Sequence, residues 1–223
     1  TKINTWVDYA KKLEETGVDG LELNFYFTPK KHSASSNEIE AGQLAIVRAV
    51  KDAVKIPVGV KLSYFYTNPL NFAMKLEEEG ADAVVAFNRL FQPDIDIHSQ
   101  IHMANFHMSF PGGHRLSLRY AGQLYDETKM SIIANTGVHT AQDLIKVILA
   151  GAHGAQMVST FYLHGKDYAK KIIPELDLWM EHNNYKSVED FRGKLSAKNV
   201  QDPFVYKRAQ YVGLLLDSDK LLG

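Results

Sequence analysis

Ala83-Val84-Val85-Ala86-Phe87-Asn88 is an uninterrupted apolar run that closes on an amide side chain. A segment that is apolar at every position has no face left for water, so this run predicts a strand that is buried on both sides. Such strands belong to parallel sheets, whose faces are covered by crossover helices. We therefore expect the flanking sequence to alternate between strands and helices.

The rest of the chain follows that alternation. Short apolar segments that end on polar residues predict further strands at residues 21–24, 57–63, 131–137 and 154–160. Segments with apolar residues at helical spacing predict the intervening helices. These are one helix capped by Thr5 and ended by Gly17, helices at residues 39–54, 69–79 and 118–128, one from the Thr140 and Asp143 capping box to Ala150, and one at residues 168–182. Residues 188–223 are interpreted as two more helical pieces.

Residues 89–119 interrupt the alternation. Asp94-Ile95-Asp96-Ile97 alternates as a strand does and Pro111-Gly112-Gly113 predicts a turn, so we interpret the segment as an inserted hairpin or lid. Histidines crowd this segment, at His98, His102, His107 and His114. The spacing of the first two would suit a metal site on a helix, but the strand-like alternation favours solvated loop histidines and no metal.

The predicted strands fit part of a barrel. Their spacing of roughly 30 residues matches the βα units of a TIM (β/α)8 barrel, of which about five would be represented and three missing. An open, doubly wound parallel sheet is also consistent with the alternation. We expect a single domain over residues 1–223, with the βα units in 1–166 and C-terminal helices in 167–223.

The beginning of the chain indicates a truncated barrel, because a helix stands there with no strand before it. An incomplete barrel exposes two apolar sheet edges. We therefore expect a homodimer, or pairing with the missing N-terminal part.

Composition favours a small-molecule partner. The formal net charge of -1 offers no basic surface for nucleic acid. Cysteine is absent, which excludes disulfides, cysteine-ligated zinc, iron–sulfur clusters and cysteine nucleophiles. The sequence has no signal-peptide pattern, and no segment reaches the about 18 apolar residues that a membrane helix needs. We expect no membrane partner and a cytoplasmic location.

Two strand ends predict where a ligand binds. In parallel α/β folds ligands bind at the C-terminal strand ends, and in barrels phosphate groups favour the last two strands. Thr136-Gly137 leads into the helix capped by Thr140, so its backbone amides and the helix dipole could bind a phosphate. Ser159-Thr160 is the matching end of the last predicted strand. Ordinary turn formation and helix capping account for the same residues equally well.

Lys61 is a charged residue in an apolar strand, in register with Gly59 and Ser63. A buried ammonium needs a partner. It could lie beside the electron-accepting ring of a flavin, form a Schiff base, or extend from the strand end to solvent. Asn24 and Asn88 end the preceding and following strands, where they could hydrogen-bond a planar heterocycle or simply form turns.

In their order and spacing, these motifs resemble the dihydroorotate dehydrogenase family. The likeness runs from Trp6 to about Gly165. It is carried by Leu21-Glu22-Leu23-Asn24, Val58-Gly59-Val60-Lys61-Leu62-Ser63, Phe87-Asn88-Arg89, Thr136-Gly137-Val138 and the strand ending Ser159-Thr160. Trp179-Met180, Tyr185 and Asp190-Phe191 are similar to the tail of a bacterial branch.

The resemblance implies FMN across the mouth of the barrel and hydride transfer to it from a small heterocycle, in pyrimidine metabolism. It implies that Lys61 lies near the isoalloxazine as a catalytic and cofactor-binding residue, with Asn24 and Asn88 facing flavin or substrate. The phosphate would be bound by Thr136, Gly137, Ser159 and Thr160.

One position departs from the family pattern. In that family, a cysteine or serine three positions after the asparagine equivalent to Asn24 removes a proton, and here that position is Phe27. Phenylalanine cannot accept a proton, which argues against oxidation of dihydroorotate itself unless Thr28, or a serine of residues 33–36, replaces the base. The sequence favours an FMN-dependent oxidoreductase. The alternatives are a Schiff-base lyase that uses Lys61 and a non-catalytic barrel that binds a phosphate ligand.

Overall fold

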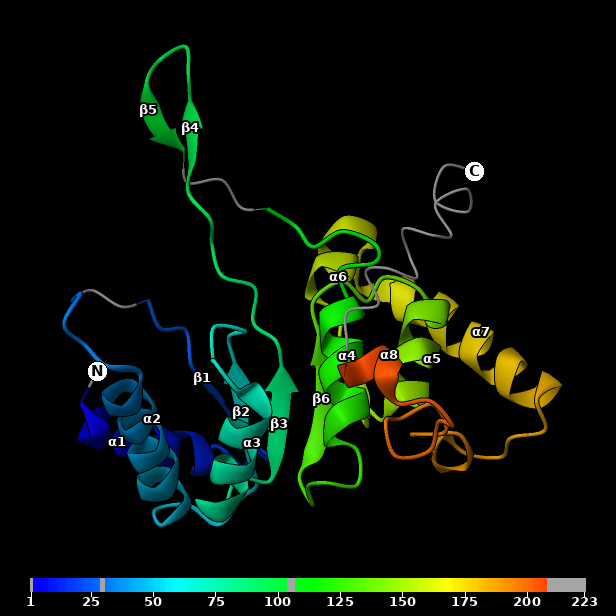
Figure 1. The fold of residues 1–223 in the computed structure, drawn as a ribbon, viewed down its shortest axis with the longest axis horizontal. Coiled ribbons are helices and arrows are strands. Elements are labelled where there is room, and N and C mark those ends of the chain that lie inside the picture. The colour runs from blue at the N-terminus through cyan, green and yellow to red at the C-terminus, as the bar shows by residue number, and fades with distance from the viewer. Residues whose placement is uncertain (1, 29–30, 104–106, 208–223) are drawn as a thin grey trace.

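The structure, a computed structural model, describes residues 2–28, 31–103 and 107–207. A parallel sheet with strand order β1-β2-β3-β6-β7 forms its centre (Figure 1). Its strands are β1 Leu21–Asn24, β2 Val58–Leu62, β3 Ala83–Ala86, β6 Ser131–Asn135 and β7 Gly154–Gln156. All five lie within the strands predicted from the sequence.

The strand order distinguishes a barrel from a doubly wound sheet. In a doubly wound sheet the order reverses at a switch point, whereas here each strand of the parallel sheet pairs with the next one along the chain. This uniform progression is that of a barrel wall. The fold is therefore a TIM (β/α)8 barrel of which five βα units are represented.

Helices follow the strands along the chain. They are α1 Ile3–Glu14, α2 Ser36–Lys51, α3 Pro69–Glu78, α4 Arg115–Leu124, α5 Ala141–Ala150, α6 Val158–His164, α7 Ala169–His182 and α8 Phe204–Lys207, with short 3-10 helices η1 Lys166–Tyr168 and η2 Val188–Asp190. None of the described helices combines the length and apolar character that a membrane crossing requires. Part of the predicted 188–223 segment, residues 208–223, lies outside the described residues.

The two faces of the sheet have different chemistry. In β2, Val58, Val60 and Leu62 are buried while Gly59 and Lys61, on the other face, are only half-buried. The buried set joins one apolar core with residues of α1 to α5. Burial of a valine or leucine side chain contributes about 1.5–3 kcal/mol, so the helix-covered face stabilises the fold and leaves the inner face free for polar groups.

Several predicted helix boundaries were wrong. The first helix begins at Ile3, so Thr5 lies inside it and does not cap it. The second begins at Ser36 instead of residue 39, because Ser35 and Glu38 form a capping box that was not predicted from the sequence. The fourth runs from Arg115 to Leu124 instead of from residue 118 to 128, so it begins inside the segment that we interpreted as the insertion. The capping box of Thr140 and Asp143 is confirmed.

The last predicted strand was also wrong beyond its first residues. β7 ends at Gln156, and residues 158–164 form α6. Ser159 and Thr160 therefore lie in the first turn of a helix and not at a strand end. The buried Thr160 hydroxyl donates to the Val138 carbonyl at 2.7 Å, a contact distant in sequence that strand periodicity cannot anticipate.

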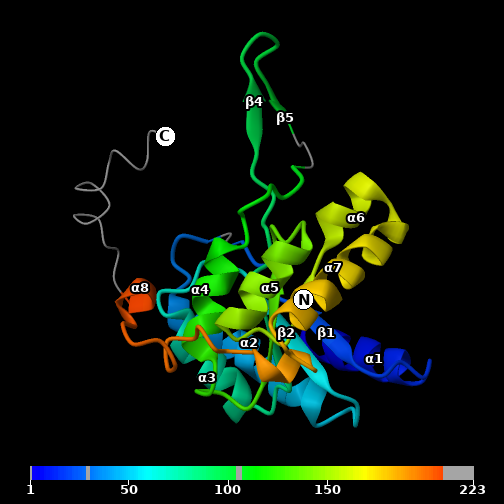
Figure 2. The ribbon, with the colours of Figure 1, turned by 90° about the vertical axis from the view of Figure 1, so that its right-hand side faces the viewer.

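The inserted hairpin is confirmed. β4 Asp94–Asp96 pairs antiparallel with β5 Ile101–Met103, and the hairpin projects from the C-terminal end of the sheet (Figures 1 and 2). The chain returns to the body at Gly113 and His114, which pack closely against Gly137 in the turn after β6. The insertion therefore touches the sheet at the turn predicted to bind phosphate.

We predict that Gly137→Ala destabilises the fold more than Gly17→Ala. Both glycines have a left-handed φ, 80° and 83°, where a Cβ costs about 1–2 kcal/mol. An added Cβ would meet the Gly113 backbone at 2.4 Å in the first case and nothing within 4 Å in the second. Such overpacking costs a further 1–3 kcal/mol, roughly. Urea unfolding of the two variants measures the difference, and equal losses would contradict the proposed contact.

Candidate functional site

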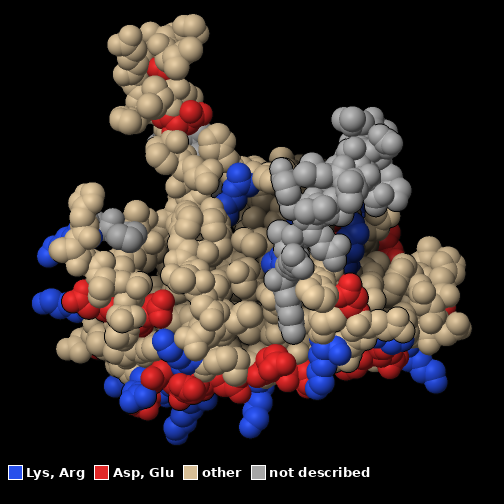
Figure 3. All heavy atoms as spheres, viewed as in Figure 1, with Lys and Arg blue, Asp and Glu red and all other residues tan. Residues whose placement is uncertain are grey.

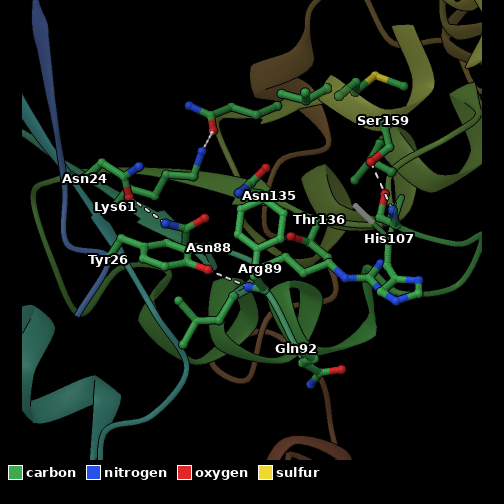
Figure 4. A pocket seen from close by; sticks show the side chains of 18 residues that line it. Asn24, Tyr26, Lys61, Asn88, Arg89, Gln92, His107, Asn135, Thr136 and Ser159 are labelled. Atoms are coloured by element: carbon green, nitrogen blue, oxygen red, sulfur yellow. Dashed lines mark hydrogen bonds between the residues drawn. The ribbon is translucent and has the colours of Figure 1, made fainter. Parts of the chain in front are cut away.

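A cavity of about 300 Å³ opens at the C-terminal ends of the strands (Figure 4). In parallel α/β folds this is the end at which ligands bind. Of the residues predicted from the sequence to form a site, it is lined by Asn24, Lys61, Asn88, Thr136, Gly137 and Ser159. The structure thus brings these six together in one place.

Lys61 lies in a network that crosses the inner face of the sheet. Its ammonium donates to Gln156 Oε1 at 2.8 Å and lies 3.5 Å from a Glu22 oxygen. The Gln156 amide donates in turn to the other Glu22 oxygen at 2.5 Å. The Lys61 side chain is 13% exposed, so this pairing supplies the partners that a poorly hydrated cation needs.

Glu22 and Gln156 were not recognised in the sequence as members of a site. For Glu22 the signal existed, because the alternation of β1 puts its side chain on the same face as that of Asn24. Gln156 stands opposite Asn135 in the β6–β7 register, which no sequence pattern specifies. The network therefore depends on tertiary pairing that the sequence alone did not provide.

The two predicted asparagines meet. The Asn88 amide nitrogen donates to Asn24 Oδ1 at 2.5 Å, so the ends of β1 and β3 are joined beside Lys61 on the strand between them. This contact leaves the side-chain nitrogen Nδ2 of Asn24 and the side-chain oxygen Oδ1 of Asn88 without a hydrogen bond to the described residues. One donor and one acceptor are thus available to a polar ring.

The turn after β6 has an unusual backbone. Thr136 has φ 75° and Gly137 φ 80°. A β-branched residue in the left-handed region is rare, and here the Thr136 hydroxyl holds it in place by donating to the Phe87 carbonyl at 3.0 Å. The same carbonyl accepts from the Asn135 amide at 2.9 Å. The turn is therefore fixed to the residue that follows β3.

Two predicted residues do not reach the cavity. Thr160 is buried and hydrogen-bonded to Val138, and it does not line the cavity. Thr28 is exposed and, with Phe27, lines a separate cavity of about 310 Å³ between α2 and the loop after β2. The structure therefore does not bring Thr28 together with Lys61.

The histidines of the insertion differ from one another. His98 and His102 are exposed, and His107 is exposed at the cavity rim. The prediction that His114 is a solvated loop residue was wrong, because it is 4% exposed and its Nδ1 lies 3.4 Å from Asp143. Because the returning end of the insertion packs against Gly137, the side chain of His114 is buried in the protein. Among the described residues, no group of three His, Asp or Glu side chains could hold a metal ion.

A buried polar cluster behind the turn was missed. The His139 ring lies 3.0 Å from the Ser109 hydroxyl, and the Ser109 backbone amide donates to Ser159 Oγ at 3.0 Å. Asp143 accepts from the backbone amides of His139 and Thr140. Burial alone would raise the pKa of Asp143, but the hydrogen bonds from His139 and Thr140 and the nearby His114 and Lys146 outweigh it, so its pKa lies below the ordinary 3.8.

Comparison with known proteins places the chain beside one group of enzymes. The family described as dihydroorotate dehydrogenase matches residues 1–180. Dihydroorotate dehydrogenase A (fumarate) of Lactobacillus helveticus is 30% identical over 195 residues, which cover 85% of this chain and 63% of that protein. The catalytic subunit of dihydroorotate dehydrogenase B (NAD(+)) of Thermoplasma volcanium is 30% identical, over 82% of this chain and 61% of that protein.

A third relative matches the chain with similar identity and coverage. The corresponding catalytic subunit of Methanocaldococcus jannaschii is 30% identical over 80% of this chain and 60% of that protein. The chain therefore spans about three fifths of the length of the curated relatives it matches.

We predict that Asp143→Asn lowers stability at neutral pH and that the deficit disappears in acid. Because the folded-state pKa is lowered, the carboxylate contributes stability above its unfolded pKa, and that contribution is lost as the pH falls through the folded value. The loss at neutral pH should be about 1 kcal/mol, since asparagine can still accept the capping hydrogen bonds.

Thermal unfolding of the wild type and Asp143→Asn, measured from pH 7 down to roughly pH 3, records whether their stabilities converge. The convergence should set in as the pH falls below the unfolded pKa of about 3.9. The exposed Asp167 serves as a control, and Asp167→Asn should track the wild type. A deficit for Asp143→Asn that is independent of pH would refute an electrostatic role.

Proposed function

The chain belongs to the dihydroorotate dehydrogenase family, and from this premise we propose that it forms part of an FMN-dependent oxidoreductase that takes a hydride from a small reduced heterocycle. The observation that carries the proposal is the meeting of Lys61, two asparagines and the Thr136–Gly137 turn in one cavity at the C-terminal strand ends. The name of one relative given above includes fumarate, and the names of the other two include NAD(+).

The residues present fit a phosphorylated flavin. The backbone N–H groups of Gly137 and Val138, both buried and lining the cavity, make no hydrogen bond to the described residues. Buried amides normally have an acceptor, and two consecutive free ones match the needs of a phosphate. Ser159 also lines this cavity.

FMN, when bound, would supply the hydride acceptor. In the proposed site Lys61 holds a positive charge at the ring, and Gln156 and Glu22 fix the position of its ammonium. The free amide groups of Asn24 and Asn88 orient the ring or the substrate. The amides of Gly137 and Val138 bind the phosphate.

The position at which the family has its proton-accepting residue departs from the family pattern. Phe27 occupies the position of the usual base, and Thr28 lies in the neighbouring cavity. We therefore propose that the substrate is a reduced heterocycle other than dihydroorotate, unless the loop that holds Thr28 moves toward Lys61. No observation specifically favours a Schiff-base lyase, since the Lys61 amine is engaged by Gln156 and Glu22.

The open edges of the sheet support a proposal about partners. Among the described residues, β1 and β7 each have one side with no paired strand. An apolar groove lined by Trp6, Tyr9 and Leu13 runs along β1. We propose that further strands, or a second copy of the chain, cover these edges.

We predict that the full-length protein binds FMN and that two substitutions shift the flavin reduction potential in opposite directions. Lys61→Met removes a cation that stabilises the reduced ring and should lower the potential, while Glu22→Gln removes the opposing charge and should raise it. For a two-electron couple, about 30 mV corresponds to about 1.4 kcal/mol.

Visible spectra record the binding, and a redox titration records the potentials. Lys51→Met, which alters a lysine at the end of α2 that pairs with Asp82 just before β3, at the opposite end of the sheet from the cavity, is the control and should leave the potential unchanged. A full-length protein that stays colourless after incubation with FMN would refute the proposed function.

We predict that Phe27→Ser increases flavin reduction by dihydroorotate. A positioned base contributes roughly 10²- to 10⁴-fold, so a serine at the family position should raise a low wild-type rate. Thr28→Val should lower any wild-type rate if Thr28 is the base. Stopped-flow measurement of flavin bleaching compares the three proteins. A fast wild-type rate that neither variant changes would show that the base lies elsewhere.

A further inference from the structure

We propose that Arg89 is the anion-recognition residue of this cavity and that its guanidinium pairs with an oxyanion of the bound ligand. This inference rests on the proposed function. The oxyanion is either the phosphate of the flavin nucleotide or a carboxylate of the substrate. Both carry negative charge and two oxygen atoms that the two N–H groups of a guanidinium can bind together.

The charged residues that line the cavity are the first observation that supports this proposal. Lys61 and Arg89 are the lysine and the arginine that line it, and no Asp or Glu occurs among the described residues that line it. Lys61 is faced by Glu22, whereas Arg89 lies within ion-pair distance of no carboxylate in the described part of the chain. In Figure 3, basic atoms are visible in the hollow below the hairpin with no acidic atoms beside them.

A half-buried guanidinium without a counter-ion is unfavourable. Removing a charge from water costs free energy that a nearby opposite charge must offset. The chain supplies such a charge for Lys61 but not for Arg89. An anionic ligand would complete the balance at the second cation.

The position of Arg89 is fixed independently of any ligand. One terminal nitrogen donates to the Met108 carbonyl at 2.6 Å, and the guanidinium lies 5.8 Å from the centre of the Phe110 ring. A guanidinium has five N–H donors, so this single bond leaves a fork free for bidentate contact. Because the side chain is already held, little conformational entropy is lost when it binds an oxyanion.

The location of Arg89 suits both sources of the oxyanion. It follows Asn88 directly, and both residues line this cavity and the adjoining one of about 210 Å³, as does Thr136. Figure 4 shows Arg89 among the residues that surround the cavity, with Asn88 and Lys61 toward one side and Thr136 and Ser159 toward the other. A ligand group near the free amides of Gly137, or one near the asparagines, could therefore meet it.

The competing interpretation is structural. Arg89 connects the outgoing and returning stems of the insertion through Met108 and Phe110, so its loss could simply loosen them. Phe110→Leu provides the matched control, since it removes the ring contact and keeps the charge. Anion recognition predicts that Arg89→Gln, but not Phe110→Leu, discriminates between charged and neutral ligands.

The test compares two pairs of ligands by calorimetry on the full-length protein. FMN and riboflavin differ by the phosphate, and orotate and uracil differ by the carboxylate. Arg89→Gln should weaken the charged member of one pair by roughly 10- to 100-fold while the neutral member is unaffected, as expected for loss of a charged hydrogen bond. Arg89→Lys should lose less, because it keeps the charge without the fork.

Each outcome decides the inference. A selective loss for FMN assigns the phosphate, and a selective loss for orotate assigns the carboxylate. If Arg89→Gln loses affinity equally for charged and neutral ligands, or loses none, the inference is overturned. The proposed function is still supported in that case, provided that the wild type binds FMN. If the wild type binds neither flavin, the proposed function fails and the orotate and uracil pair decides the role of Arg89. A wild type that binds neither FMN nor orotate would overturn both the proposed function and the inference. If Arg89→Gln does not fold, Arg89→Lys replaces it, and it should weaken the charged member of one pair selectively but by less; no selective loss would overturn the inference.

Discussion

The candidate site depends on one requirement: the ammonium of Lys61 must have partners on the inner face of the sheet. Those partners are Gln156 on β7 and Glu22 on β1, the two outermost strands of the sheet, while Lys61 itself lies on β2. A flat sheet could not bring these strands within the reach of side chains. The network therefore both neutralises a charge and links the edges of a curved wall across its interior.

The separation of polar and apolar residues between the two faces explains why a site can exist without weakening the fold. The helix-covered face contains the apolar core, so the inner face can carry a lysine, a glutamate and several amides. At the C-terminal ends these side chains meet the turn of Thr136 and Gly137 and the stems of the insertion. Recognition groups of different kinds are thereby gathered from segments distant in sequence.

Sequence patterns were sufficient for the strands but not for their surroundings. The apolar runs and capping residues predicted where every strand of the parallel sheet lies, and the hairpin followed from the alternation of Asp94 to Ile97. Ser159 and Thr160 were assigned to a strand because a short apolar run does not distinguish strand from helix. The burial of His114 and the role of Gln156 were not predicted, because their environments are created by packing between distant segments, which no local periodicity records.

The insertion between β3 and β6 has a consequence for divergence. Pairing of these strands must close a loop that contains the whole hairpin, yet the entropy of loop closure grows only with the logarithm of length, by about 0.6 kcal/mol for each doubling. Adding or deleting residues at the hairpin tip should therefore change the stability of the sheet very little. The hairpin that projects beyond the sheet can change its length and chemistry across generations while the sheet itself stays the same.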